Sequence, residues 1–348
     1  MKGRRQKAEG RRILRSVIMT SALCLLPSAF AADQSVLRPA GPQAERLVTL
    51  WWIFLWVCTA FYVAILAFFF AAMIRGRRNT VPDVTEGTEQ RLGTAVWTAI
   101  IVSTIGLLAL LVTSVAAGRD VGRFAADNPA QIEIEVIGHQ WWWEVKYPDA
   151  LVPSHQIVTA NEIHIPIRAP VLIRLVTRDV IHSLWIPNLH GKLDLIPGRV
   201  NKFRLQADRP GVYRGQCAEF CGLQHAHMAL AIIAEEPEKF AEWKTHQGRG
   251  APTPTTAQQV RGLQVFLGAP CANCHNVAGI DAYATLGPDL THFRSRPTLA
   301  AGTLLNTRGN LAGWISNAAA IKPGAQMPPN QLSAAELQDL LAYLDTLR

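Results

Sequence analysis

Hydrophobic and polar residues follow different periods in successive parts of this 348-residue chain. A first long apolar segment has no charged residue between Arg46 and Arg75, and residues 94–118 form a second one. A helix needs about 20 mostly apolar residues to cross the hydrocarbon of a bilayer. The sequence therefore predicts two membrane-spanning helices, at about 48–74 and 94–116. Because both segments are long and free of charge, a pair of buried helices in a soluble core is the weaker interpretation.

The flanks of these segments predict how the helical hairpin is oriented. Trp51 and Trp52 lie near one end of the first segment, and the basic cluster RGRR at 75–78 follows its other end. Aromatic side chains favour the membrane interface, and Lys and Arg are enriched in cytoplasmic loops. We therefore expect the hairpin loop in the cytoplasm and the chain after Arg119 on the outer side.

A shorter apolar stretch follows a strongly basic N-terminus. Residues 1–15 contain seven Lys or Arg and one Glu, so they hold most of the formal net charge of +8. The stretch VIMTSALCLLPSAFA then ends with small residues around Phe30, which is typical of a cleaved secretory signal over 1–31. An uncleaved anchor helix is the alternative, and either segment would export the chain. The rest is nearly neutral and has no basic stripe, which argues against nucleic-acid binding.

Beyond Arg119 the period shortens to that of β-strands. QIEIEVI at 131–137 alternates apolar and charged residues, and several short β-branched runs follow it up to GVYRGQC at 211–217. Short strands at this spacing favour an all-β antiparallel sandwich or barrel, which we assign to 120–240. The segment between the presumed signal and this unit, 32–119, holds the helical hairpin.

The C-terminal part is predicted to be helical. Residues 241–256 form a linker rich in Pro, Gly and Thr, and a unit of about ninety residues, 257–348, follows it. Its last segment begins with Ser333 and Glu336 at the spacing of a capping box and then carries leucines on one helical face.

The motif QCAEFCGLQHAHM at 216–228 gathers soft metal ligands. Cys217 and Cys221 are four residues apart, and His225 and Met228 follow at short intervals. Thiolate and thioether groups combined with imidazole select copper over harder cations. Two cysteines can bridge a pair of metal ions, and each ion would then need its own imidazole.

A second histidine must therefore come from elsewhere in the sandwich. His182 lies just before a predicted strand and is the best candidate, while His190 and His227 are its competitors. A disulfide is the ordinary state of two nearby cysteines in an exported protein. It would give no reason for a histidine and a methionine to follow at ligand spacing.

A second, independent motif lies in the terminal unit. CANCH at 271–275 is the haem-attachment pattern, in which Cys271 and Cys274 bond to the vinyl groups and His275 binds the iron. Met327 is the last methionine of the chain and the best sixth ligand, with His292 as its rival. Met/His ligation is typical of electron-carrying cytochromes.

Three consecutive tryptophans follow the first predicted strand. Alternation along a strand places Trp141 and Trp143 on one side and Trp142 on the other, so at least one ring is expected to face solvent. An exposed aromatic patch would suggest a docking surface. Packing in the core and at an interface is the simpler interpretation for Trp142 and Trp143.

The motifs VIHSLWIP, KLDLIPGR and CAEFCGLQHAHM resemble subunit II of the haem-copper cytochrome c oxidases. The two apolar segments and GHQWWWEVKYP at 138–148 agree with this family. The resemblance implies a cupredoxin-like sandwich that carries the dinuclear copper centre CuA. The residues it implies as copper ligands are the bridging Cys217 and Cys221, the terminal His182 and His225, the weakly bound Met228 and, through its backbone carbonyl, Glu219.

The same resemblance implies further roles. The Glu219 carboxylate would help to bind a magnesium ion at the boundary with subunit I, and Trp141 would be the point at which electrons enter. The terminal unit resembles class I cytochromes c, to which Gly262, Phe266 and GPDL at 287–290 conform. The expected fold class is thus a two-helix transmembrane hairpin, an all-β cupredoxin-like sandwich and an all-α cytochrome c domain.

The resemblance to this family implies the subunit through which electrons enter a proton-pumping cytochrome c oxidase of the inner membrane. A periplasmic donor such as a cytochrome c would reduce haem c, and electrons would reach CuA and then the haem-copper centre of subunit I, with subunit III as a further partner. A membrane-anchored electron shuttle and the corresponding subunit of a nitric or nitrous oxide reductase are the alternatives. A quinol oxidase would have lost the copper ligands.

One position departs from the family pattern. Many relatives have a glutamate at the mouth of a proton path, three residues before the tryptophan of the second helix, and this chain has Thr94 before Trp97. Glu86 or Glu89 are the candidates to replace it, unless the path begins elsewhere.

Overall fold

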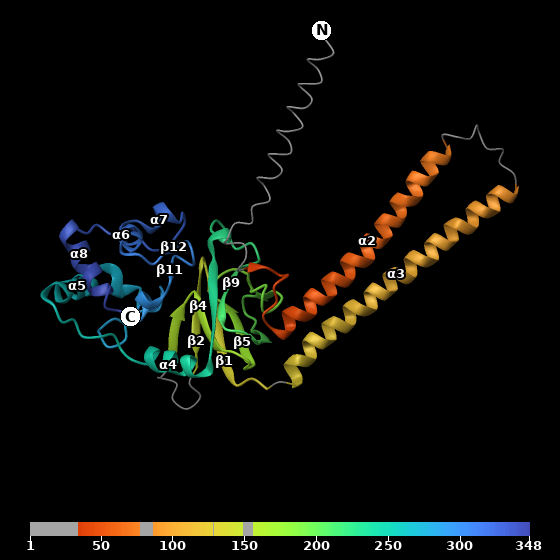
Figure 1. Cartoon of the computed structure of the whole chain (residues 1–348). Coiled ribbons are helices and arrows are strands. Elements are labelled where there is room, and N and C mark those ends of the chain that lie inside the picture. The colour runs from red at the N-terminus through yellow and green to blue at the C-terminus, as the bar shows by residue number, and fades with distance from the viewer. Residues whose placement is uncertain (1–33, 77–85, 128, 149–155) are drawn as a thin grey trace, which may run out of the picture.

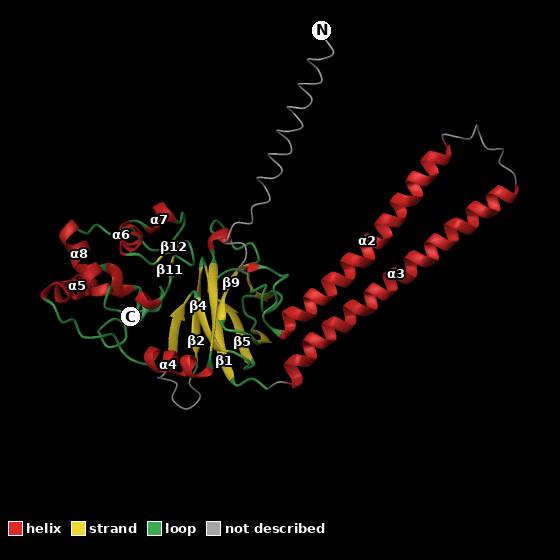
Figure 2. Cartoon of the chain, in the orientation of Figure 1, coloured by secondary structure: helices red, strands yellow, loops and turns green. Residues whose placement is uncertain are grey.

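The computed structural model describes residues 34–76, 86–127, 129–148 and 156–348 of the chain. The predicted signal segment, 1–31, lies outside the described residues. Within them the chain forms a helical hairpin, a β-sandwich and a terminal helical domain (Figures 1 and 2).

The hairpin consists of α2 (Pro42–Gly76) and α3 (Glu86–Asp127), which run side by side away from the sandwich (Figure 1). Both are long and apolar enough to cross a membrane. Each helix extends at both ends beyond the predicted apolar segment, into more polar residues. Large side chains such as Trp56 and Phe68 are exposed along their length. This is expected of a surface that lipid or a partner covers.

The sandwich contains two five-stranded sheets (Figure 2). The first has the order β3 (Ile157–Ala160), β2 (Trp142–Tyr147), β1 (Ile132–His139), β5 (Val171–Thr177), β8 (Asn201–Leu205). The second has the order β4 (Glu162–Pro166), β10 (Ala229–Glu235), β9 (Gly211–Cys217), β6 (His182–Trp185), β7 (Leu193–Leu195).

The predicted all-antiparallel arrangement is wrong for two strand pairs, because β1 pairs with β5 and β10 with β4 in parallel. Alternation within a strand does not distinguish parallel from antiparallel neighbours. The alternation itself is confirmed, since β5 buries every second residue. Ile134, Trp143, Leu175 and Ile232 are fully buried between the sheets and form part of the core.

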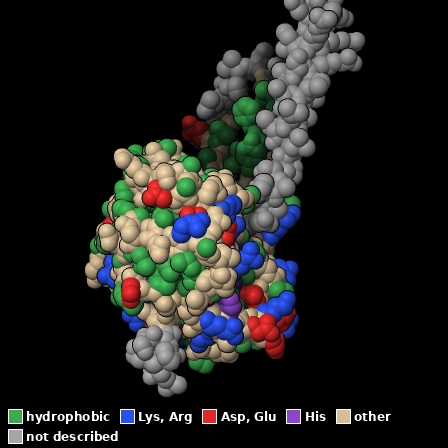
Figure 3. Space-filling model, turned by 90° about the vertical axis from the view of Figure 1, so that its left-hand side faces the viewer, with side chains coloured by type: hydrophobic (Ala, Val, Ile, Leu, Met, Phe, Trp, Pro, Cys, Tyr) green, Lys and Arg blue, Asp and Glu red, His purple; other side chains and the backbone are tan. Residues whose placement is uncertain are grey.

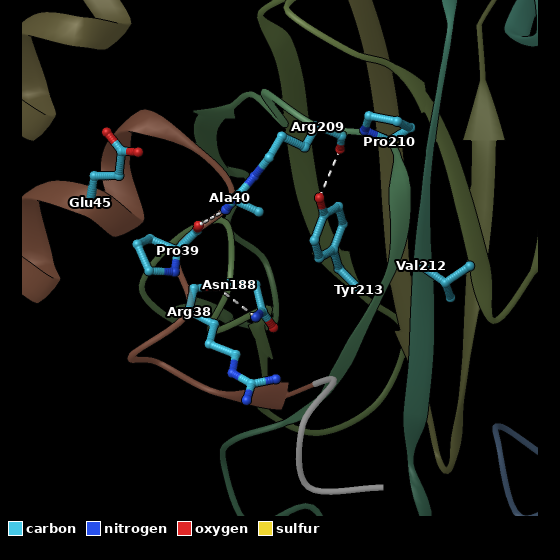
Figure 4. Close-up of a pocket in the computed structure, with 9 residues that line it drawn as sticks. All are labelled: Arg38, Pro39, Ala40, Glu45, Asn188, Arg209, Pro210, Val212 and Tyr213. Carbon is cyan, nitrogen blue, oxygen red and sulfur yellow. Dashed lines mark hydrogen bonds between the residues drawn. The ribbon is translucent and has the colours of Figure 1, made fainter. Parts of the chain in front are cut away.

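The chain before α2 packs on one end of the sandwich. The backbone N–H of Ala40 donates to the carbonyl of Asn188, and the Asn188 amide donates to the carbonyl of Arg38. A cleft of about 540 Å³ lies beside this contact, with Arg209 and Tyr213 on its sandwich side (Figure 4). No predicted copper or haem ligand lines this cleft, which therefore belongs to the junction between the hairpin and the sandwich.

A helix joins the sandwich to the terminal domain. α4 (Pro237–Gln247) extends into the predicted linker, so only residues 248–256 remain between it and the next helix. These residues are tied to the terminal domain, because the Ala251 N–H donates to the carbonyl of Ala278. The linker is thus shorter and better anchored than its composition indicates.

The terminal domain is built on two crossing helices, α5 (Ala257–Gly268) and α8 (Ala334–Leu344). A Cβ on Gly262 would lie 2.0 Å from the carbonyl oxygen of Asp339, so only glycine allows this approach. Phe266 packs beside Tyr343. The capping box at the start of α8 is confirmed. The smaller elements are α6 (Arg308–Ser316), α7 (Ala318–Ile321) and the hairpin β11 (Thr298–Leu299) and β12 (Leu304–Leu305).

Charged side chains on the outer face of this domain are interspersed by sign, and uncharged side chains lie between them (Figure 3). Several acids are paired, including Asp339 with Arg261 and Asp345 with Arg294. Side chains of both signs are thus mixed on this face (Figure 3).

Candidate copper and haem sites

The loop between β9 and β10 places the soft ligands around one point. β9 ends at Cys217, β10 begins at Ala229, and the Cys217 N–H donates to the carbonyl of Met228, which closes the loop at its base. β6 lies next to β9, with Leu184 opposite Cys217. This pairing delivers His182 from a segment 35 residues earlier.

The donor atoms of all six predicted copper ligands lie within contact distance of one of the two sulfurs. Both cysteines are free, with Sγ atoms 3.7 Å apart. Cys217 Sγ lies 3.8 Å from His182 Nδ1 and 3.2 Å from the Glu219 carbonyl oxygen. Cys221 Sγ lies 3.7 Å from His225 Nδ1 and 3.9 Å from Met228 Sδ. Two thiols with two imidazoles, a thioether and a carbonyl are a donor set that suits a pair of copper ions.

Hydrogen bonding prepares the two thiols differently. The contact with Cys221 lowers the pKa of the Cys217 thiol, and the same contact together with burial raises the pKa of Cys221. Both side chains are buried. A thiol must lose its proton to bind a metal, so the binding of metal to this pair would release protons.

Asp179 is a candidate site residue that the sequence analysis did not name. Its Oδ1 accepts a hydrogen bond of 2.8 Å from His182 Nε2, which leaves Nδ1 facing Cys217. The backbone N–H groups of Gln140 and Val180 also donate to this carboxylate. Burial alone would lower the pKa of His182, but Asp179 and Cys217 raise it. A carboxylate behind a ligating histidine fixes its tautomer and orientation, and the motif RDVIH carried that signal.

The two competing histidines lie outside the cluster. His190 Nδ1 lies 3.1 Å from the carbonyl oxygen of Gly191, and His227 Nδ1 lies 2.8 Å from Gln224 Oε1. Among the described residues, the group of histidine, cysteine and acidic side chains that could share a metal ion is His182 with the two cysteines.

The tryptophan run divides as the strand alternation predicts. Trp143 is fully buried and lies near His182, whereas Trp142 is half-buried and stacks on His139. Trp141 is buried as well, and its Nε1 donates to the carbonyl of Cys221 over 2.9 Å. The expectation of a solvent-facing ring is met only in part, by Trp142. Trp141 instead contacts the backbone of Cys221, a predicted copper ligand.

The haem motif forms a 3-10 turn (Pro270–Asn273) at the end of α5. The Nδ1 of His275 donates to the carbonyl of Pro288 over 2.7 Å, which leaves Nε2 for a metal. A Cβ on Gly287 would lie 2.6 Å from this ring, so the glycine allows the loop to press against it. Burial lowers the pKa of His275, which favours the neutral imidazole that binds iron. These residues fit a haem, and Met327 lies half-buried at the edge of the domain core.

His292, the rival haem ligand, is engaged elsewhere. It is buried, and its two ring nitrogens lie 2.7 Å and 2.9 Å from the carbonyl oxygens of Arg348 and Arg249. Both nitrogens thus face backbone oxygens. His292 ties the linker to the end of the chain.

Two family models match this chain, one over the sandwich and one over the terminal domain. The family model for the periplasmic domain of cytochrome c oxidase subunit II matches residues 132–235, and the family model for cytochrome c matches residues 259–348.

Two curated relatives match nearly the whole chain. Cytochrome c oxidase subunit 2 of Alkalihalophilus pseudofirmus is 33% identical over 322 residues, which are 90% of this chain and 91% of the relative. The protein of the same name from Bacillus subtilis is 29% identical over 337 residues, 90% of this chain and 92% of the relative.

Solved structures match part of the chain. The periplasmic domain of subunit II of cytochrome oxidase from Bradyrhizobium japonicum is 30% identical, with a TM-score of 0.32, over 34% of this chain and 94% of that one. A chain of a heme-copper terminal oxidase dimer is 26% identical, with a TM-score of 0.32, over 40% of this chain and 99% of that one.

Proposed function

Because the chain belongs to the cytochrome c oxidase subunit II family, we propose that it is the subunit through which electrons enter a proton-pumping oxidase. Electrons would pass from a periplasmic donor to haem c, then to CuA, and then to the haem-copper centre of subunit I, where dioxygen is reduced to water. The chain is part of an oxidoreductase, and its two family matches imply a copper centre in the sandwich and a haem in the terminal domain.

The observation that carries this proposal is that two imidazoles, a thioether and a backbone carbonyl converge on the Cys217 and Cys221 sulfurs, which lie 3.7 Å apart. When bound, a dinuclear copper centre accepts and releases one electron at a time. The chain's own part is to hold the ligands rigidly and to keep water away. Asp179 orients His182, the closed loop fixes the spacing of the cysteines, and the ligand sulfurs are buried. Rigid, supported ligands are what such a site requires.

In the terminal domain Cys271 and Cys274 would hold haem c covalently. His275, oriented by its hydrogen bond to Pro288, and Met327 would be the two protein ligands of the iron. A thioether ligand raises the reduction potential of such a haem. The domain would therefore be an electron carrier built into the chain.

Two further assignments extend the proposal. The Glu219 carboxylate is partly exposed and forms a long ion pair of 4.0 Å with Lys192, so it would contribute to a magnesium site at the boundary with subunit I by exchanging this partner for the ion. The hairpin would cross the inner membrane twice, with both metal-bearing domains in the periplasm and subunits I and III beside the exposed apolar helices.

The test uses the full chain in detergent, loaded with copper and matured with haem, and compares Cys217→Ser with the matched control Cys58→Ser. Cys58 is exposed on α2, so its substitution makes the same chemical change far from the site. Electron paramagnetic resonance of the parent and the control should show one unpaired electron shared by two coppers. Cys217→Ser should lose this signal and keep a low-spin haem.

Two results would contradict the proposal. A copper signal localised on one ion in the parent chain, or no copper binding, would refute the CuA assignment. Purification of the chain from its membrane with both sites filled and without an oxygen-reducing partner would favour the electron shuttle instead.

A further inference from the structure

The copper domain and the haem domain meet at a junction around Lys322. This lysine follows α7 in the haem domain and is 3% exposed. Its Nζ donates to the carbonyl oxygens of Trp141 at 2.8 Å, His227 at 2.8 Å and Ala300 at 2.9 Å. The first two acceptors belong to the copper domain, and the third belongs to the haem domain.

This arrangement uses every donor of the side chain. An ammonium group has three protons, and each of the three carbonyls accepts one. Lysine is rarely buried unless it is paired. Among the described residues no carboxylate supplies the pairing, and the backbone does so instead. Burial lowers the pKa of Lys322 to about 8, and the nearby Cys221 opposes this shift.

The backbone of the haem domain has an unusual conformation where it contacts this lysine. Ala300, Ala301 and Gly302 have positive φ angles of 54°, 56° and 81°. Two consecutive alanines in the left-handed region are strained, and such strain is found where the surroundings require it. The turn points the Ala300 carbonyl at Lys322, and the Ala301 carbonyl accepts the N–H of Ala229 in the copper domain over 3.0 Å.

The same junction encloses Trp141. A Cβ on Gly324 would lie 3.0 Å from the edge of the Trp141 ring, so the backbone of the haem domain packs directly against it. The Gln224 amide donates to the carbonyl of Pro323 over 2.9 Å. Trp141 is thus held by its carbonyl through Lys322, by its ring against Gly324 and by its indole N–H through the carbonyl of Cys221.

We propose that Lys322 is a positioning residue that fixes the haem domain on the copper domain and closes Trp141 to outside donors. The inference rests on the proposed function. With the junction closed, transfer between the two sites takes place at a fixed separation and needs no search by a mobile domain. An outside donor must then deliver its electron to the haem domain.

The experiment compares Lys322→Met with Lys239→Met in the assembled oxidase. Methionine keeps much of the length of the side chain and removes the ammonium, and Lys239 is an exposed lysine of α4. Haem c is photoreduced by a flash, and the rate at which the copper centre is reduced is measured at two solvent viscosities. Hydrogen exchange of the peptide that contains Ala229 reports whether the junction is closed.

We expect Lys322→Met to slow this transfer at least about tenfold, because losing hydrogen bonds to a charged donor shifts a docking equilibrium by that factor or more. The remaining rate should fall as viscosity rises, and the Ala229 amide should exchange faster. The spectra of both metal sites should stay as in the parent. Lys239→Met should match the parent in every measurement.

An unchanged rate with a protected Ala229 amide would overturn the inference. So would loss of the copper spectrum in Lys322→Met, because the lysine would then build the copper loop rather than position the domain. If the parent itself passes no electron from haem c to copper, the proposed function fails. If the parent and Lys322→Met transfer electrons equally fast, only the role of Lys322 fails.

Discussion

Asp179 provides the sharpest test of how the copper ligands are held. Its carboxylate accepts hydrogen bonds from His182 Nε2, from the backbone N–H groups of Gln140 and Val180 and, over 3.4 Å, from the Thr177 hydroxyl. In Asp179→Asn one oxygen remains as acceptor, and the amide NH₂ adds a donor that repels a donating ring. The variant therefore keeps the size of the side chain but loses the force that turns Nδ1 of His182 toward Cys217.

The size of the effect follows from the contacts that are lost. Groups behind a metal ligand typically contribute about 10- to 100-fold in affinity, which is about 1.4–2.7 kcal/mol. His182 is fully buried, which favours the upper end of this range, but the Asp179 side chain is 28% exposed. Because solvent screens a partly exposed carboxylate, we expect the lower half of the range.

The assay is copper affinity of the full chain, measured by competition with a chelator, for Asp179→Asn and the control Asp208→Asn. Asp208 also accepts a side-chain hydrogen bond, from Gln206, but contacts no copper ligand. The control should bind like the parent, and Asp179→Asn should bind more weakly and show an altered paramagnetic spectrum. Affinity within twofold of the parent would refute the reasoning that the carboxylate orients the ligand.

Two further predictions concern stability. Gly262→Ala should destabilise the haem domain by about 3 kcal/mol and lower its unfolding midpoint, because the new Cβ would clash with the backbone of α8. Gly268 has open space around it, so the control Gly268→Ala should leave the midpoint unchanged. Burial would raise the pKa of Glu144, but hydrogen bonds from His139 and Lys146 hold it below its ordinary value of 4.5. The ionised carboxylate therefore stabilises the fold above pH 4.5, and this stabilisation is lost as the pH falls through the folded pKa. Thermal unfolding of the full chain should therefore depend less on pH below 4.5 in Glu144→Gln than in the parent, and equal pH profiles would contradict this.

The sequence was sufficient where the signals are local. Cys217, Cys221, His225 and Met228 lie within twelve positions, so their spacing alone predicts a shared site, and the distances around the two sulfurs are consistent with it. His182 is different. From the residues alone, His190 and His227 remained competitors for the role of second imidazole ligand. Only the pairing of β6 with β9 brings His182 to Cys217.

The sequence was insufficient for contacts between residues that lie far apart in the chain and show no periodic pattern. Lys322 lies in KPGAQM and has the pattern of an exposed lysine in a loop, yet it is buried by segments that lie up to 181 positions away. Its three partners are backbone carbonyls, which leave no trace in residue identities. The parallel pairing of β1 with β5 was missed for the same reason, since alternation describes one strand and not its neighbour.

Burial of Trp141 changes what the fused haem domain does for the chain. In the oxidase family implied by the sequence motifs this position is where an outside donor would be received. Here the ring is 9% exposed and lies between Cys221 and Gly324. The composition of the linker suggested a loosely tethered haem domain. Such a domain would contact the surface around Trp141 only part of the time. The short linker and the Lys322 contacts argue instead for a docked carrier. Under the proposed function, the choice of an outside donor would then depend on the exposed face of the haem domain rather than on the tryptophan.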